Sequence, residues 1–210
     1  FFFSSRRRHT RFALVSWARR CVIRDRINFL LFGILFLLPY SQSMAYDEPN
    51  YEVIQKNEIY EIRKYSDRLA VETIDSGSDN NFRKLFNYIS GKNEDNEKIK
   101  MTTPVTQFKK NGNMSMQFYL PSKFNLKNVP KPMKENVRIV NIEGGYYAVI
   151  KYSGRANDKN FIKHKDILLK ELKIDNVFIT SPSIRATYDS PFTLPMNRRN
   201  EAMFKIDYQF

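Results

Sequence analysis

"YEIRKYSDRLAVETI", residues 60–74, alternates apolar and polar side chains on both sides of a break at Ser66 and Asp67. Alternation with a period of two indicates strands with one buried face, and a Ser-Asp pair is typical of a turn. This stretch therefore predicts strand, turn, strand. "VRIVNIEGGYYAVIKYSG", residues 137–154, has the same pattern around two glycines.

A helix is predicted after each of these stretches. In the first, apolar residues recur at i, i+3, i+4 and i+7, namely Phe82, Leu85, Phe86 and Ile89. Ser78 or Asp79 can cap the start of this helix, and Gly91 can end it. In the second, the apolar stripe is Phe161, Leu168 and Leu172, and Asp158 can cap the start.

Two strand-like segments follow each helix. They are residues 101–108 and 114–121 after the first helix, and 177–188 and 201–208 after the second. The chain thus repeats a strand–helix–strand–strand unit at an offset of roughly eighty residues. This duplication predicts an α+β fold, a distorted antiparallel β-sheet or barrel with two flanking helices.

The charge of the chain is concentrated at its N-terminal end. Of the net +13 over 210 residues, residues 1–45 carry eight arginines and one aspartate, which leaves +6 for residues 46–210. This is the charge of a mildly basic globular surface rather than of a nucleic-acid-binding face. We therefore expect no nucleic-acid partner.

Three segments of the chain have different expected roles. Residues 1–21 resemble translated adapter sequence, and we expect them to be a non-native arm. Residues 22–45 combine a basic flank, a short apolar core and small residues before Tyr46, which is the pattern of a secretory signal peptide. An uncleaved membrane anchor is the alternative. Residues 46–210 then form one domain, in which no intramolecular disulfide can form because the only cysteine is Cys21.

Few residues offer obvious catalytic or metal chemistry. His164 is the only histidine outside the arm, and no His/Cys cluster, glycine-rich phosphate loop or C-x-x-C-H motif is present. His164 lies near the edge of the second helix's apolar stripe, so we interpret it as a structural histidine. The alternative is an axial metal or haem ligand.

Five motifs, in order, resemble the SOUL haem-binding protein family. They are "YEIRKY", "FRKLFNYISGKNEDNEKIKMTTPV" (82–105), "MSMQFYLP" (114–121), "RATYDSPFTLP" (185–195) and "RRNEAMFKI" (198–206). The resemblance extends from about Tyr51 to Tyr208. It implies a distorted antiparallel barrel flanked by two helices, in agreement with the duplication, and non-covalent binding of haem or a related tetrapyrrole.

The resemblance also implies where the ligand binds. In the family the first helix supplies an apolar wall of the proposed groove, and the matching positions are Phe82, Leu85, Phe86 and Ile89. Arg83 and Lys84 are placed to pair with the propionates. The alternative is that this apolar stripe belongs to the core, and both can hold for different residues of one helix.

The sequence departs from the family at two places. Some members have a histidine, a proposed haem ligand, where this chain has Lys64, and a protonated lysine is a poor ligand for iron. Ser190 and Phe192 replace a proline and a tryptophan that are common in the family. We interpret Met101–Val105 as the extended start of a strand that touches no ligand.

The sequence therefore predicts an exported, non-covalent haem or tetrapyrrole binder without catalysis, which meets the membrane only through its signal segment. Its apolar groove would have a basic rim. Two alternatives stay open: an exported interaction module that binds a protein segment or another apolar molecule, and a small-molecule enzyme on the same scaffold.

Export makes a direct prediction. We expect the mature N-terminus at or near Tyr46, on the far side of the membrane, because the apolar core and the small residues before Tyr46 form a cleavage site. N-terminal sequencing of the purified protein measures this. Soluble cytoplasmic protein that retains residues 27–38 would contradict it.

Overall fold

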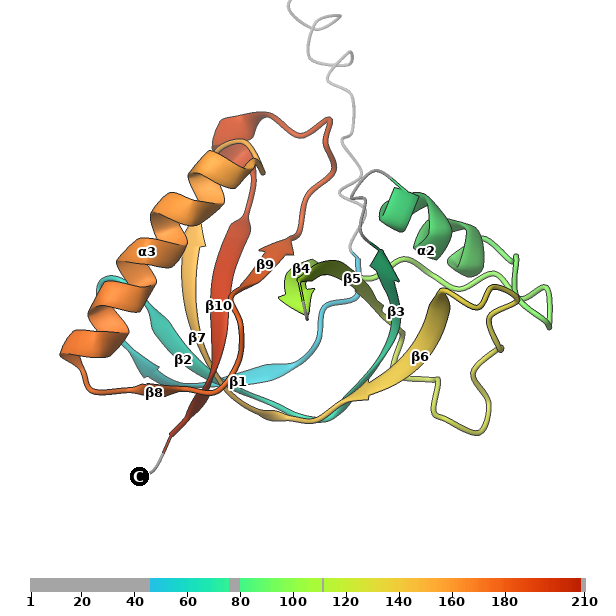
Figure 1. Ribbon diagram of the computed structural model, residues 1–210, viewed down its shortest axis with the longest axis horizontal. Coiled ribbons are helices and arrows are strands. Elements are labelled where there is room, and N and C mark those ends of the chain that lie inside the picture. Colours follow the sequence, from blue (N-terminus) through green and yellow to red (C-terminus); the bar gives the residue numbers. More distant parts are fainter. Residues whose placement is uncertain (1–45, 76–79, 111, 209–210) are drawn as a thin grey trace, which may run out of the picture. The chain divides into compact units, whose positions relative to one another are not determined.

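The computed structural model describes residues 46–75, 80–110 and 112–208 (Figure 1). The strands are β1 (Tyr51–Lys56), β2 (Glu61–Tyr65), β3 (Arg68–Asp75), β4 (Val105–Lys110), β5 (Asn113–Tyr119), β6 (Val137–Ile142), β7 (Gly145–Tyr152), β8 (Phe178–Ile179), β9 (Ile184–Thr187) and β10 (Asn200–Asp207). The helices are α2 (Asn81–Ile89), α3 (Asp158–Ile174) and the short 3-10 helix η2 (Pro195–Asn197). The expected segment boundaries at residues 21 and 45 lie outside the described residues.

The strands form one antiparallel sheet that confirms the α+β prediction. Its order is β1-β2-β7-β10-β9-β4-β5-β3-β6, and β8 pairs with β10. The units β3-α2-β4-β5 and β7-α3-β9-β10 have the same pairing pattern, and the β4–β9 ladder joins them. The order therefore reads as one duplicated unit arranged around a central β4–β9 seam.

Neither of the two predicted strand–turn–strand segments folds back on itself as a hairpin. β2 pairs with β7, and β3 pairs with β6, so the two long segments run side by side through their bends. At the bend, Tyr65 lies opposite Gly145 and Arg68 lies opposite Ile142. A Cβ atom on Gly144 would lie 2.5 Å from the backbone oxygen of Tyr65, so only glycine allows this close approach. Figure 1 shows this bent ribbon linking the two halves of the sheet.

Both helices cover the same outer face of the curled sheet. The ladders align Ala202, Arg185, Gln107 and Met116 as successive neighbours across β10, β9, β4 and β5. Side chains of one such row share a face. Ala202 packs in the cluster of buried apolar residues around α3, which we call the α3 cluster. Met116 packs in the corresponding cluster around α2, which we call the α2 cluster. A strip of sheet centred on β4 and β9 therefore lies between the helices.

Three local predictions differ from the structure, and a fourth falls on residues outside the described ranges. The side chain of Asn157, not Asp158, caps α3 by accepting a hydrogen bond from the backbone N–H of Asn160. Residues 177–188 form two short strands, β8 and β9, rather than one, and β4 begins only at Val105. Helix α2 has Asn80 at its N-cap, while the expected caps at residues 78 and 79 lie outside the described residues.

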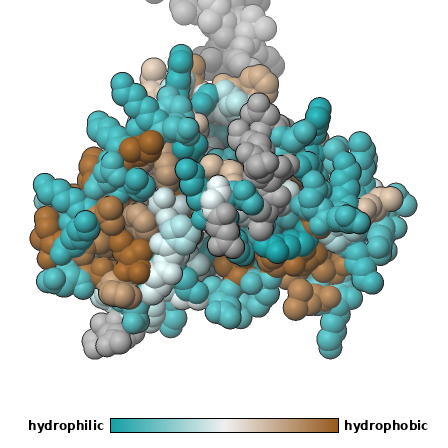
Figure 2. Space-filling model, viewed as in Figure 1, coloured by the Kyte–Doolittle hydropathy of each residue, from teal (hydrophilic) through white to brown (hydrophobic). Residues whose placement is uncertain are grey.

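Most large apolar side chains are internal. Leu168 and Leu172 of α3 are fully buried against β7 and β10, and Leu85 of α2 is fully buried against β3 and β5. The face seen in Figure 2 is largely hydrophilic, with apolar patches on its left side and at its lower right. None of the helices in the described ranges is long and apolar enough to cross a membrane.

The inner face of the sheet encloses a network of charged side chains. Arg63 and Glu201 are both 0% exposed, and the Arg63 guanidinium donates to both Glu201 oxygens at 3.0 and 3.2 Å. Arg63 also donates to Glu61 at 2.8 and 2.9 Å, and the Tyr188 hydroxyl donates to Glu201 at 2.7 Å. Such a buried pair is tolerated only because its hydrogen bonds are complete.

Ionisation of these groups follows from their partners. Burial alone would raise the pKa of Glu61, but hydrogen bonds from Arg63 and Lys56 lower it below 4.5. The ionised form of Glu61 therefore stabilises the fold at neutral pH, and this contribution is lost as the pH falls through the lowered pKa. Burial would lower the pKa of Arg63, but the charge of Glu201 raises it above its usual value.

We expect Glu201→Gln to destabilise the fold by roughly 3–5 kcal/mol, because it leaves the buried Arg63 guanidinium partly uncompensated. Glu48→Gln is the matched control, since Glu48 forms an exposed ion pair with Arg199 and should cost less than about 1 kcal/mol. Urea unfolding of both variants measures the difference. If both variants lost the same small amount of unfolding free energy, the buried Arg63–Glu201 pair would not be important for stability.

A second prediction concerns residues 1–45. All described elements begin after Asn50, and the described residues form one compact unit. A protein that starts at Tyr46 should therefore unfold cooperatively, with a melting temperature close to that of the full chain. A fall of many degrees in the thermal scan would show that the domain boundary is misplaced.

Candidate functional site

A groove of about 590 Å³ lies over the strip of sheet between the two helices. We call it the α2 groove. Its floor consists of Val105 and Gln107 of β4, Met116 of β5, and Arg185 and Thr187 of β9. These side chains point outward because they share the face on which both helices pack. A volume of this size is within the range of small-molecule sites.

Helix α2 supplies an aromatic wall. Phe82 and Phe86 line the groove, and each is about half exposed, at 47% and 48%. Their ring centroids are 6.0 Å apart with an interplanar angle of 12°, because residues four apart lie on one side of a helix. Phe82 also makes an edge contact of 5.2 Å with Phe118, which fixes its ring. The wall therefore presents two nearly parallel rings.

The segment before β4 forms another part of the groove. Met101, Thr103 and Val105 line it, whereas Thr102 points to the opposite side and donates a 2.6 Å hydrogen bond to the backbone oxygen of Tyr119. The backbone N–H of Thr103 donates a 3.0 Å hydrogen bond to the backbone oxygen of Asp47. The interpretation of this segment as a strand start alone is therefore incomplete, because its alternate side chains line the groove.

The connection between β9 and β10 closes the groove with polar groups. Ser190, Pro191 and Arg198 line it here. The Arg198 guanidinium donates to the backbone oxygens of Thr193, at 2.7 Å, and Pro191. These partners are neutral, and Arg198 forms no ion pair among the described residues. The Asp189 carboxylate, which also lines the groove, accepts a 2.6 Å hydrogen bond from the backbone N–H of Arg199.

A second cation on the groove floor is already paired. Arg185 donates to the Asp158 carboxylate at 2.6 Å, and its guanidinium lies 4.6 Å from the Phe161 ring centroid. The hydrogen bond from Arg185, together with its charge, lowers the pKa of Asp158. Arg198 is therefore the more available partner for an anion that enters the groove.

The six site residues expected on α2 lie in different surroundings. Phe82 and Phe86 line the groove, while Leu85 and Ile89 are buried in the α2 cluster. Arg83 is not among the lining residues, and it donates to the side chain of Asn80 at 2.7 Å. Lys84 lines a smaller hollow next to Met133. The expected apolar stripe is thus divided between core and groove.

The groove residues that the sequence analysis missed come from distant segments. Arg198 and Ser190 lie about a hundred residues after α2, and Met101 follows a loop. The only signal for them in the sequence was their place inside the motifs at 82–105, 185–195 and 198–206. Their meeting depends on the β4–β9 ladder, which no local pattern specifies.

His164, the candidate metal ligand, and Lys64, at the position of the family's proposed ligand, both lie elsewhere. The His164 ring stacks on Tyr152 at 4.2 Å, and its Nδ1 lies 2.8 Å from the backbone oxygen of Asn160. The ammonium of Lys64 lies 5.8 Å from the Tyr146 ring centroid. Neither lines the α2 groove. Within the described residues, no three His, Cys, Asp or Glu side chains gather as a metal site would require.

Chemically, the α2 groove suits a flat apolar ligand with an acidic edge. Two parallel aromatic rings and two thioethers, from Met101 and Met116, can contact an apolar plate. Arg198 can pair with a carboxylate at its rim.

Comparison with known proteins identifies the family of the chain. Residues 46–205 match the family described as SOUL heme-binding protein. Heme-binding protein 2 of Mus musculus is 34% identical over 161 residues, which cover 68% of this chain and 75% of that protein. Heme-binding protein 2 of Homo sapiens is 32% identical with the same coverage.

Solved structures share the fold at much lower identity. The C-terminal domain of EcmrR matches with a TM-score of 0.54 at 10% identity, over 75% of this chain and 98% of that chain. An uncharacterized conserved protein from Listeria innocua matches with a TM-score of 0.53 at 9% identity, over 72% and 94%. These two likenesses concern the fold alone. By its match over residues 46–205 and its curated relatives, the chain belongs to the SOUL haem-binding protein family.

Proposed function

We propose that this chain binds haem or a related tetrapyrrole, non-covalently, in the α2 groove. The observation that carries the proposal is the pair of half-exposed, nearly parallel rings of Phe82 and Phe86 beside a groove of about 590 Å³. Membership of the SOUL family and relatives named heme-binding protein 2 support the choice of ligand.

The chemistry of a porphyrin matches the residues of the groove. A porphyrin is a flat apolar plate with two carboxylates at one edge. Its plate would cover Phe82, Phe86 and Met101, and removing apolar surface from water stabilises the complex by about 25 cal/mol per Å². Its carboxylates would pair with Arg198, whose guanidinium is held by backbone carbonyls. Arg83 and Lys84, the cations expected from the sequence, lie outside the lining of the groove.

Axial ligation is expected to be weak. When bound, haem would supply an iron that can accept a donor atom from the protein. The lining residues include no histidine or cysteine, and the thioethers of Met101 and Met116 are the soft donors among them. We therefore propose that apolar contact and propionate pairing provide most of the affinity.

The proposal extends to location and to the kind of activity. The basic flank and apolar core within residues 22–45 support export to the periplasm or outside the cell. We propose binding without catalysis, since the relatives are named for binding haem.

Hemin titration of the full chain, followed at the Soret band, tests this proposal. Phe86→Asp should weaken binding by at least about 2 kcal/mol, because it places a carboxylate against the porphyrin face. Arg198→Glu should weaken it by about 1 kcal/mol, or roughly fivefold, through repulsion of a propionate. His164→Ala should leave the spectrum nearly unchanged.

Two control variants sharpen the test. Phe178→Asp changes another exposed phenylalanine, on β8, and should bind hemin like the wild type. Arg83→Glu tests the cation that the sequence predicted at the rim. We expect it to weaken hemin binding less than Arg198→Glu does. If Phe86→Asp and Arg198→Glu stay folded and bind normally while His164→Ala removes an axial-ligand spectrum, the proposed site is wrong.

A further inference from the structure

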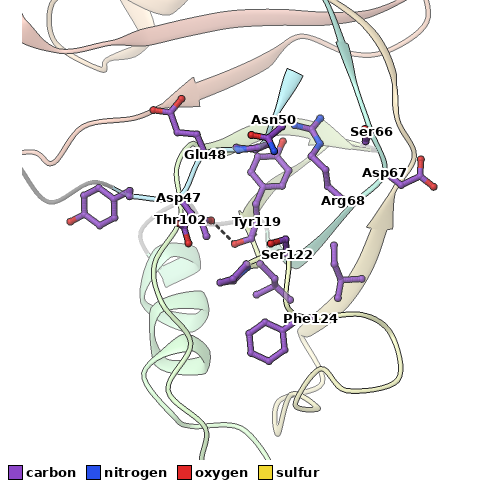
Figure 3. Close-up of a pocket in the computed structure, with 15 residues that line it drawn as sticks. Asp47, Glu48, Asn50, Ser66, Asp67, Arg68, Thr102, Tyr119, Ser122 and Phe124 are labelled. Carbon is purple, nitrogen blue, oxygen red and sulfur yellow. Dashed lines mark hydrogen bonds between the residues drawn. The ribbon is translucent and has the colours of Figure 1, made fainter. Parts of the chain in front are cut away.

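A second cavity, of about 610 Å³, lies on the other side of the Met101–Val105 segment. We call it the Arg68 cavity. Residues 46–50 before β1, the bend at 66–69, Thr102, and residues 119–122 with Phe124 line it (Figure 3). It opens where the inner face of the sheet meets solvent. Tyr46 lines both this cavity and the α2 groove, and none of the other residues of the Arg68 cavity lines that groove.

Three tyrosine rings surround the guanidinium of Arg68. Its Cζ lies 4.2 Å from the centroid of Tyr65, 4.7 Å from that of Tyr119 and 5.6 Å from that of Tyr147. Aromatic faces attract and orient a guanidinium without neutralising its charge. Arg68 is thus held in place as a cation.

Arg68 has hydrogen-bonding capacity that the described residues do not use. Its Nε atom is buried and has no hydrogen-bond partner among them. Buried donors in folded proteins are normally satisfied, so an unused one beside a cavity indicates an absent acceptor. Asn50 also lines the cavity (Figure 3), and its side-chain amide can donate a hydrogen bond to a ligand there.

The acidic residues of the cavity are already engaged. Asp47 pairs with Lys100 at 3.2 Å, and Glu48 pairs with Arg199 at 2.9 Å. Asp67 accepts a 2.8 Å hydrogen bond from the backbone N–H of Gly144, and Figure 3 shows its carboxylate directed away from Arg68. The Arg68 charge therefore has no carboxylate partner among the described residues.

The remaining wall is apolar. Leu69, Leu120, Pro121 and Phe124 line it, next to the cationic end. We propose that the Arg68 cavity is a binding site for a small organic monocarboxylate with an apolar or aromatic body, whose carboxylate pairs with Arg68 and whose body contacts this wall. A guanidinium fork matches the two oxygens of a carboxylate.

Benzoate is the probe that tests this site on the full chain. We expect the Arg68 Nε–Hε NMR signal to shift saturably on titration with benzoate. Benzamide has the same shape without the charge, and it should bind at least tenfold more weakly. Arg68→Gln should weaken benzoate binding at least tenfold, whereas Arg83→Gln, an exposed control on α2, should leave it unchanged.

The outcomes separate this site from the haem site. Arg68→Gln should leave hemin binding intact, and Arg198→Glu should leave benzoate binding intact. Equal binding of benzoate and benzamide by the wild type would overturn the proposal without any variant. Benzoate binding with wild-type affinity in folded Arg68→Gln or Arg68→Lys would also overturn the proposal. So would displacement of benzoate by a lower concentration of inorganic phosphate at constant ionic strength.

Discussion

The inner face of the sheet is organised around one buried cation. Arg63, on β2, uses its guanidinium nitrogens to bond Glu61, Tyr65 and Glu201, and the last of these lies two strands away on β10. A charge with no exposed surface needs this complete set of partners. The pair thereby fixes how β2, β7 and β10 lie across the inner face, and α3 packs on the outer face of β7 and β10.

The short segment at residues 101–105 contributes side chains to both the α2 groove and the Arg68 cavity. Residues 101–105 run between them. Met101, Thr103 and Val105 line the α2 groove, while Thr102 lines the Arg68 cavity. The motif is thus part of both candidate sites as well as the start of β4.

Periodicity predicted the strands and helices because it reports local burial, and the duplication predicted an antiparallel sheet with two flanking helices. Which strands pair was not predicted. Periodicity could not show which apolar residues of α2 face the core and which face the groove. Phe82 and Phe86 form one edge of the apolar stripe, and Leu85 and Ile89 form the other. Only the packing of α2 on β3 and β5 shows which edge is buried. Arg198 and Arg68 could not be singled out either, because the other residues of their cavities come from segments far along the chain.

The central claim is that haem occupies the α2 groove, and paramagnetic broadening of amide NMR signals tests it most directly. Hemin is added to the isotope-labelled full chain and compared with diamagnetic gallium protoporphyrin. We predict that signals of Phe82, Phe86 and residues 101–105 broaden first, followed by those near Arg198. Broadening centred on His164 in α3, or on the residues around Arg68, would contradict this account.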